Sequence, residues 1–437
     1  MRDTTAVPGG GGAANPGFTD TYRHLVLIIL TAMYVINYLD RQILNILLQP
    51  IKNEFHVSDT ALGLLAGPTF AVFYATLGIP IARLADRFNR RNIIAASIGL
   101  FSLMTVVCGM AAQFSQLLVA RIFTGVGEAG TGPSAMSIIS DLYPPETRAT
   151  AQSFYSAGLN IGILLAFLFG GWIAQTYGWR TAFLAAGVPG LAMVFVVLLA
   201  MREPLRGHSE QTVDDGVAVP FGEVCRYLWS QRSIRFIALG AAMSAFGGYG
   251  ATAFVPAFLV RSHHLSLAEV GVVFAMIVGV GGWVGTFLSG VVSDRLARRD
   301  IRWNMFVPMS AGIIGLPFSV TFYLAPSATV AILAAAVPSA LGAVFLGPCI
   351  SMTQGLVSLR MRVTAAAILL FILNIIGLGL GPQAVGLVSD LLRPMLGVDS
   401  LRYALLIGPL SGLVASYLYW QASKTLKSDL ARVKTGV

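Results

Sequence analysis

Four charged side chains of this chain fall inside long apolar stretches, where charge is costly. The chain has 29 Lys and Arg and 20 Asp and Glu residues, and only Asp40, Arg41, Arg121 and Glu128 lie well within a stretch long enough to cross a bilayer. A charge at the bilayer centre costs on the order of 3 kcal/mol or more. We therefore expect these two acids and two bases to face one another or a polar path, where they bind a cargo or carry a proton.

The spacing of these residues predicts how they pair. Arg121 and Glu128 are seven residues apart, so they share one helix face and lie about 10 Å apart along its axis. Counted from the ends of their apolar stretches, Asp40 and Arg121 lie at similar depths and Glu128 lies deeper. This predicts an Asp40–Arg121 pair, with Arg41 as a possible partner of Glu128.

Glu128 has two interpretations. Burial disfavours its charged form, whereas a neighbouring arginine favours it. A carboxylate held between these two effects can exchange a proton as water enters from either side, which is what proton coupling requires. In the alternative, Glu128 is a permanently ionised partner that joins two helices.

The elements that carry these residues are predicted to be membrane-spanning helices. The sequence is 56% hydrophobic and 11% charged, against about 25% charged in soluble domains. Its apolar stretches are long enough to cross about 30 Å of hydrocarbon as helices. The prediction is an all-α integral membrane protein with twelve transmembrane helices, at roughly 24–48, 60–84, 92–112, 115–141, 149–175, 181–201, 233–260, 267–293, 303–324, 328–356, 364–389 and 401–422.

A ten-residue segment occurs twice and divides the chain into two halves. The segment 82–91 matches 290–299, so that Asp86 corresponds to Asp294 at an offset of 208. Two equivalent halves in an apolar protein usually close around a central path. The repeated charges are Asp86, Arg87, Arg90 and Arg91 in the first copy and Asp294, Arg295, Arg298 and Arg299 in the second.

The basic residues predict the orientation. With the N-terminus in the cytoplasm, the inner loops hold sixteen arginines and the outer ones hold five basic residues, as the positive-inside rule requires. The net charge of +9 therefore reflects topology rather than nucleic-acid binding. Both termini are then cytoplasmic, and the lack of an Asn-X-Ser/Thr site favours a bacterial plasma membrane.

The predicted parts of the chain are a disordered tail (1–22), a six-helix bundle (23–202), a cytoplasmic linker (203–232), a second six-helix bundle (233–424) and a tail (425–437).

Other polar residues within the predicted helices are candidates for lining the path. The alternative for each of them is a hydrogen bond that packs helices together. They are Asn37, Tyr155, Asn160, Tyr249, Gln354 and Asn374.

These motifs resemble those of the major facilitator superfamily. The two Asp-Arg-x-x-Arg-Arg loops resemble its signature between the second and third and between the eighth and ninth helices, although Ala82 stands where Gly is usual. Residues 121–125, Arg-Ile-Phe-Thr-Gly, resemble its fourth-helix signature. The resemblance implies two pseudo-symmetric bundles, alternating access, and a cytoplasmic lock around Asp86 and Asp294. Ala166-Phe167 replaces the Gly-Pro of the antiporter signature, which argues against antiport.

Within that superfamily the chain is most similar to the spinster-like transporters of sphingolipids and lysolipids. The similarity lies in Asn-Tyr-Leu-Asp-Arg at 37–41 and Gly-Val-Gly-Glu-Ala at 125–129. It implies an amphiphilic cargo, proton coupling, and functional roles for Asp40, Arg121 and Glu128. The organic anion–cation symporters share the first motif, so a proton-driven symporter of small organic anions is the alternative.

The remaining expectations concern cofactors, partners and rival classes. We expect no cofactor and no metal, protons as the coupling ion, membrane lipids and an amphiphile as partners, no nucleic acid, and a monomer. An intramembrane enzyme is not expected, because all five histidines lie in loops or at helix ends and no His-Glu-x-x-His or Gly-x-Ser-x-Gly occurs. A non-transporting sensor is equally disfavoured.

Overall fold

The computed structural model describes residues 18–204 and 219–435, and throughout these ranges the chain is helical, with no strand. Most of the predicted N-terminal tail and about half of the predicted linker lie outside the described residues. Short polar residues begin several helices by accepting a backbone N–H bond at the N-terminus: Thr19, Ser58 and Asn89 do so for α1, α2 and α4.

The first half contains eight helices that make six membrane-length segments. Two segments are interrupted, one at Gly67 between α2 and α3 and one near Gly130 between α5 and α6. The helices are α1 (Asp20–Phe55), α2 (Asp59–Ala66), α3 (Pro68–Arg87), α4 (Arg90–Met110), α5 (Phe114–Glu128), α6 (Thr131–Leu142), α7 (Pro145–Tyr177) and α8 (Trp179–Ala200).

The second half repeats this plan with more interruptions. Two segments contain π-helical turns, η1 and η3. The elements are α9 (Phe221–Ser230), α10 (Arg232–His263), α11 (Leu267–Phe274), η1 (Ala275–Gly281), α12 (Gly282–Ala297), α13 (Trp303–Leu324), α14 (Ala328–Leu341), α15 (Leu346–Gly355), η2 (Leu359–Met361), α16 (Arg362–Ile372), η3 (Leu373–Leu380), α17 (Gly381–Leu396), η4 (Gly397–Asp399), α18 (Ser400–Ala404) and α19 (Ile407–Thr435).

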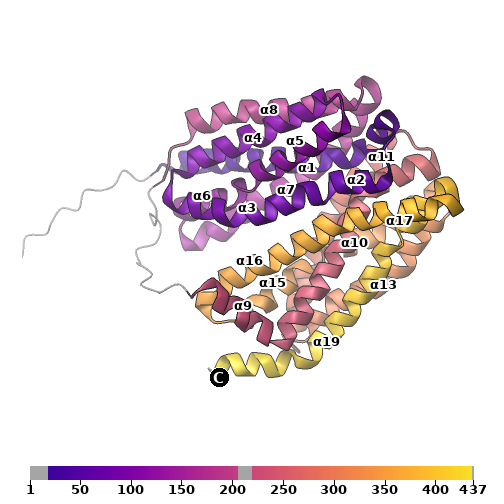
Figure 1. Ribbon diagram of the computed structural model, residues 1–437. Helices are drawn as coiled ribbons and strands as arrows, with labels where there is room; N and C mark the ends of the chain where they lie inside the picture. Colours follow the sequence, from indigo (N-terminus) through magenta and orange to yellow (C-terminus); the bar gives the residue numbers. More distant parts are fainter. Residues whose placement is uncertain (1–17, 205–218, 436–437) are drawn as a thin grey trace, which may run out of the picture.

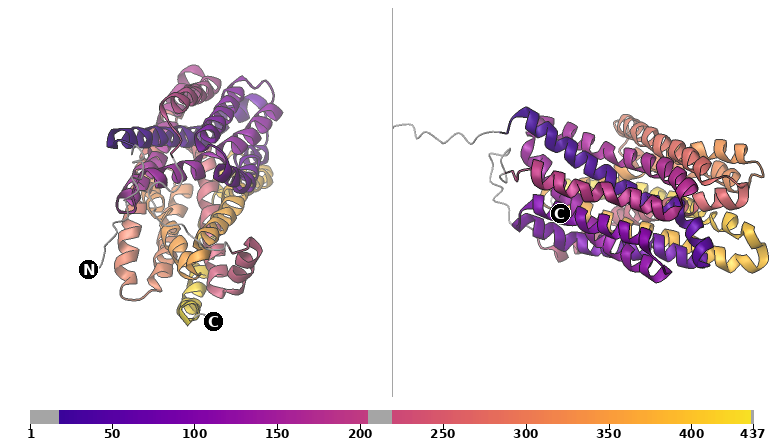
Figure 2. Two further views of the ribbon diagram at one scale, coloured as in Figure 1. Left: turned by 90° about the vertical axis from the view of Figure 1, so that its left-hand side faces the viewer. Right: turned by 90° about the horizontal axis from the view of Figure 1, so that it is seen from above.

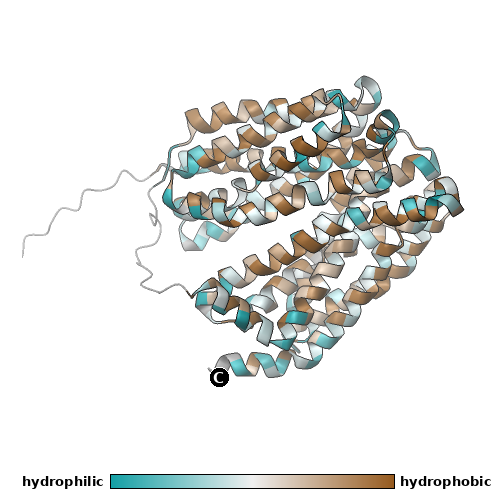
Figure 3. Cartoon of the chain, viewed as in Figure 1, coloured by the Kyte–Doolittle hydropathy of each residue, from teal (hydrophilic) through white to brown (hydrophobic). Residues whose placement is uncertain are grey.

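These elements follow the twelve predicted spans closely. In the described part of the chain, nine helical stretches are long and apolar enough to cross a membrane by length and composition. The remaining three spans are α5 with α6, α11 to α12, and α19. Hydrophobic residues predominate along the middle parts of the helices, and hydrophilic residues gather at many helix ends (Figure 3). Several edges differ from prediction: α1 continues to Phe55, α17 to Leu396 and α19 to Thr435, and the linker ends in a helix, α9.

The two halves lie one over the other and meet mainly at one end. Helices α1–α8 form one group, and α9–α19 form a second group that lies mostly below it in Figure 1, with α11 reaching up to contact α7 (Figures 1 and 2). The groups approach where α2 contacts α17 and diverge toward the end where α1 begins and α19 finishes (Figure 1). We call these the joined end and the terminal end.

The hydrophobic core follows the same division. One buried cluster spans both halves and contains Leu44 and Leu62 together with Phe254 and Phe258. A second cluster, which includes Leu30 and Ile139, belongs to the first half, and a third, which includes Ile237 and Leu426, belongs to the second. Shared burial therefore holds the halves together only over part of their length.

Glycines allow the closest approach between the halves. A Cβ on Gly171 of α7 would lie 2.4 Å from the carbonyl oxygen of Leu267, and one on Gly271 of α11 would lie 2.4 Å from that of Phe167. Any side chain at either position would force these backbones apart.

Candidate functional site

Arg41 and Glu128 form a buried ion pair between α1 and α5. The Arg41 Nη2 atom donates to Glu128 Oε1, and the two side chains are 7% and 3% exposed. Two helices of the first half are thus joined at the depth where the sequence places its intramembrane charges. Breaking such a pair from one side leaves a buried charge without a partner and costs about 3–5 kcal/mol.

Asp40 is bound by a hydroxyl group rather than by an arginine. Thr105 of α4 lies with its Oγ1 atom 2.5 Å from both carboxyl oxygens of Asp40. The predicted Asp40–Arg121 ion pair is not formed in the described part of the chain. The prediction compared depth along the helices only, and depth does not say which way a side chain points around the helix axis.

Arg121 is buried, 2% exposed. Its Nε atom has no hydrogen-bond partner. Its guanidinium lies 5.1 Å from the ring centre of Phe70 in α3, and the Arg41 guanidinium lies 5.0 Å from the same ring. Arg41 also lies 4.7 Å from the ring of Tyr74. Aromatic faces therefore stabilise both cations.

Both arginines line a small cavity between the two halves. Its volume is about 20 Å³, enough for one water molecule. The first half contributes Arg41, Gln42, Asn45, Ala66, Phe70 and Arg121, and the second half contributes Tyr249, Thr252, Ala253, Leu378 and Pro382. The cavity walls thus combine two cations with aromatic and aliphatic side chains.

The other predicted polar residues divide between this site and its surroundings. Tyr249 lines the cavity. Asn37 is buried and donates to Thr131 Oγ1 at 2.8 Å, and Thr131 in turn donates to the Glu128 carbonyl at 2.9 Å. Tyr155 is buried with its hydroxyl unpartnered. Asn160, Gln354 and Asn374 are half-buried and are not among the residues that line the cavity.

The first of the repeated loops is a tightly bonded junction within the first half. Arg90 is buried, 2% exposed, and binds Asp141 at 2.5 Å and Glu203 at 2.7 Å. Arg91 donates its backbone N–H to Glu203 and its guanidinium to the Met201 carbonyl. These contacts connect the start of α4 to α6 and to the chain beyond α8.

The second repeated loop is unlike the first. Asp294, Arg295, Arg298 and Arg299 are all exposed, as is Arg87 in the first copy. The side chain of Asp86 lies outside the described residues. The predicted lock around Asp86 and Asp294 therefore stays a prediction, and in this structure the halves diverge at that end (Figure 1).

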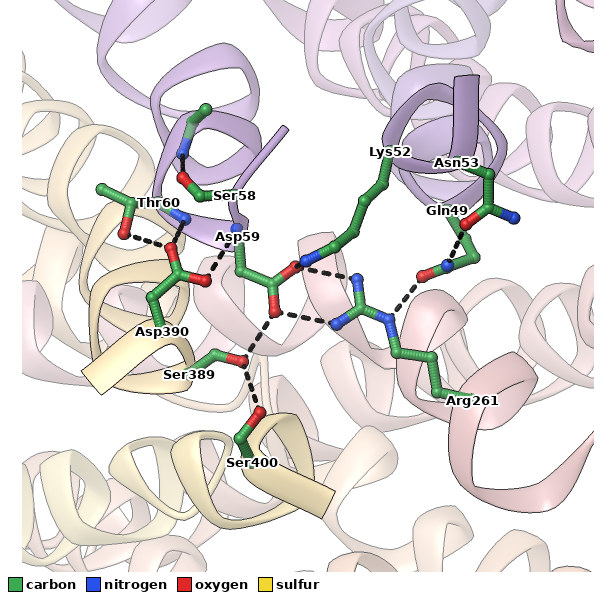
Figure 4. A network of polar contacts seen from close by, with 11 residues as sticks. Gln49, Lys52, Asn53, Ser58, Asp59, Thr60, Arg261, Ser389, Asp390 and Ser400 are labelled. Carbon is green, nitrogen blue, oxygen red and sulfur yellow. Dashed lines mark hydrogen bonds and ion pairs between the residues drawn. The ribbon is translucent and has the colours of Figure 1, made fainter. Parts of the chain in front are cut away.

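Sequence reasoning missed a second polar network, at the joined end (Figure 4). Asp59 at the start of α2 is 1% exposed and accepts hydrogen bonds from the Nη1 and Nη2 atoms of Arg261 in α10, each at 2.8 Å. Lys52 of α1 lies 2.5 Å from Asp59 Oδ1, and Ser389 of α17 donates to Oδ2 at 2.7 Å. Three helices besides α2 thus converge on one carboxylate.

Asp390 extends this network across the two halves. Its carboxylate accepts the backbone N–H groups of Asp59 at 3.1 Å and Thr60 at 2.7 Å, and the Thr60 hydroxyl at 2.6 Å. A residue of the second half therefore binds the N-terminus of a first-half helix, where backbone N–H groups and the helix dipole favour an anion. Lys52, Asp59 and Arg261 lie in the terminal turns of their helices, and Asp390 directly follows a predicted span. The sequence alone does not distinguish charges at such positions from charges exposed to solvent.

Comparison with known proteins gives consistent matches over nearly the whole chain. The sequence pattern of the Major Facilitator Superfamily matches residues 30–382. An "MFS-type efflux pump" from Mycolicibacterium smegmatis is 32% identical, and the alignment covers 92% of this chain and 93% of that protein. "Protein spinster homolog 1" from Xenopus tropicalis is 25% identical, covering 95% of this chain and 83% of that one.

A solved structure is similar in both sequence and fold. It is described as a bacterial homolog of the human lysosomal transporter Spinster in an inward-facing and unoccupied conformation. It is 32% identical and superimposes with a TM-score of 0.87, covering 94% of this chain and 99% of that one. The occupied inward-facing form gives a TM-score of 0.84.

Proposed function

Because the chain belongs to the major facilitator superfamily and is a spinster-like secondary transporter, we propose that it moves an amphiphilic, lipid-like molecule by alternating access, coupled to protons through Glu128. It is an integral membrane transporter rather than an enzyme. The observation that carries the proposal is the buried Arg41–Glu128 pair beside a cavity lined by both halves.

The chemistry of the cavity supports an amphiphilic cargo. Arg41 and Arg121 offer two guanidiniums to a polar or anionic head group. Phe70, Tyr249 and Leu378 offer apolar surface beside them. A head group at the arginines and a chain between the halves would use both kinds of wall.

The ion pair suggests how a proton is coupled to movement. Protonation of Glu128 removes its charge and releases Arg41, which then becomes free to bind an anionic cargo. Loss of the proton restores the Arg41–Glu128 pair, and Arg41 then releases the cargo. A ligand shifts a conformational equilibrium only through different affinities for the two states, and this exchange of partners supplies such a difference.

The orientation follows from the arginine-rich loops. We infer that the terminal end faces the cytoplasm, so that the joined end faces outward and this conformation is open inward. The similarity to an inward-facing relative supports this inference. We further propose that the protein resides in a bacterial plasma membrane as a monomer. It uses protons as the coupling ion, without a cofactor, and does not bind nucleic acid.

The test uses purified protein in liposomes with a pH-sensitive dye inside and lysolipids or sphingoid lipids added outside. Proton movement that depends on the amphiphile should occur with the wild type and be lost in Glu128→Gln. The matched control is Glu146→Gln, an exposed acid in the first turn of α7, which should behave as the wild type does. If Glu128→Gln moves protons normally, Glu128 is a structural partner and the coupling assignment fails.

A symporter of small organic anions is the second candidate. Two arginines on one small cavity suit a carboxylate. The Escherichia coli "Probable L-galactonate transporter" is 26% identical over 283 residues. In the same assay, silence with every amphiphile and a response to sugar acids would favour this candidate.

A further inference from the structure

Helix α9 connects the two halves, and only one flank of its apolar stripe packs on the protein. Val224 and Leu228 are 0% and 6% exposed and join the core of the second half. The Tyr227 hydroxyl donates to the Leu356 carbonyl at 3.4 Å. The helix is therefore fixed to the second half and is not a free connector.

The other flank of the stripe carries exposed aromatic side chains. Phe221 is 50% exposed and Trp229 is 69% exposed, with the half-buried Cys225 between them. These residues are spaced four apart, so they lie on one face of the helix. An amphipathic helix with aromatic side chains exposed along one flank favours contact with a lipid interface.

Chain connectivity places helix α9 close to the membrane surface. The membrane-spanning helix α10 begins at Arg232, and only Gln231 separates it from the end of α9 at Ser230. Helix α9 therefore lies beside the boundary of the hydrocarbon, at the depth where Trp side chains prefer to reside.

The charges around α9 are mostly positive. Segments 219–235 and 355–365 together contain five arginines and a single acid, Glu223. The Tyr227–Leu356 bond joins the two segments in space. Four of the five are exposed: Arg226, Arg232, Arg360 and Arg362. Basic side chains close to an anionic lipid surface are attracted to it.

We propose that α9 is an interfacial anchor that binds the head groups of anionic phospholipids and holds the second half at the surface of the bilayer. Phe221, Cys225 and Trp229 enter the head-group region, and the arginines bind the phosphates. This surface lies outside the transport cavity, and the inference does not depend on the cargo or on proton coupling.

Cys225 provides the probe for the test. Cys108 and Cys349 are 1% and 0% exposed, so an environment-sensitive maleimide dye should label Cys225. The labelled protein is reconstituted in phosphatidylcholine vesicles with and without phosphatidylglycerol, using lipids brominated near the head group as quenchers. We expect quenching by the bromolipid, together with a blue shift that increases with phosphatidylglycerol.

Two variants separate the apolar from the ionic contribution. Phe221→Ser with Trp229→Ser should lose the quenching, and Arg226→Gln with Arg232→Gln should lose the response to phosphatidylglycerol. Trp172→Ser is the matched control, because Trp172 is 51% exposed on α7, and it should change neither. Quenching by aqueous iodide but not by bromolipid would overturn the anchor. A dye that responds equally in both vesicle types would overturn the preference for anionic lipid.

Discussion

Arg261 and Asp59 form a two-pronged ion pair that joins the two halves of the molecule at the joined end (Figure 4). Arg261 belongs to α10 and Asp59 to α2, so the pair must break whenever the halves separate there. The geometry is favourable, because two parallel N–H···O bonds fix the carboxylate. The pair therefore contributes to the preference for the conformation described here.

Removing the arginine tests that contribution. We predict that Arg261→Gln shifts the equilibrium toward the state that is open at the joined end by about 2 kcal/mol, roughly 30-fold. The estimate is below the full cost of breaking a buried pair because Lys52 continues to neutralise Asp59. Distances between spin labels across the joined end would measure the change.

Glu54→Gln is the control for that experiment. Glu54 pairs with Arg180 at 2.6 Å near the same end, but both residues belong to the first half. Its removal should leave the distances between the halves as they are. If the two variants behave alike, the Arg261–Asp59 pair is incidental to the conformational equilibrium.

A steric change at the same end should act through a different mechanism. A Cβ on Gly386 of α17 would lie 2.2 Å from the Asp59 carbonyl oxygen, across the contact between halves. We predict that Gly386→Ala destabilises the joined state by about 1–3 kcal/mol and moves the spin-label distances as Arg261→Gln does. Gly412→Ala, where a Cβ meets no atom within 4 Å, should have no effect on these distances.

The sequence predicts the elements of this fold better than it predicts their contacts. Apolar length indicates twelve spans because hydrocarbon thickness is a strong constraint on helices. It does not indicate that the spans break at Gly67 and near Gly130 or that η1 and η3 are π-helical. At Gly67 the break depends on packing between the halves, because a Cβ there would lie 2.5 Å from the carbonyl oxygen of Gly379. Apolar length carries no such information.

The candidate site shows the same limit. The cost of placing a charge inside the membrane identifies four residues that require partners: Asp40, Arg41, Arg121 and Glu128. Of the expected contacts, the one between Arg41 and Glu128 is present. The same reasoning overlooks Thr105, because a hydroxyl in an apolar helix carries no signal. It also overlooks Asp59, whose position at a helix end conceals its burial.

Thr105 should matter to stability out of proportion to its size. Thr105→Val keeps the shape and removes the hydroxyl that bonds the buried carboxyl group of Asp40. We predict a loss of about 1–3 kcal/mol, measured as a lower unfolding temperature in detergent, with Thr105→Ser recovering most of it.

The matched control is a second buried threonine. Thr124 of α5 is 0% exposed and donates to the Ala120 carbonyl of its own helix. Thr124→Val removes a hydroxyl from a comparable environment without leaving a carboxyl group unpartnered, so it should cost well under half as much. Equal losses of stability in the two variants would mean that the hydrogen bond to Asp40 contributes no more than an ordinary buried hydroxyl does.

The two copies of the repeated loop should respond unequally to the same substitution. Arg90→Gln removes a buried cation from two acids and two further hydrogen bonds, whereas Arg299→Gln removes an exposed side chain. We predict that the first lowers stability by about 3–5 kcal/mol and the second by about 0.5 kcal/mol or less. Chemical denaturation of the purified variants measures both. A role of these arginines in orientation alone predicts equal and small effects, so similar midpoints for the two variants would contradict the assignment of Arg90 as a structural junction of the first half.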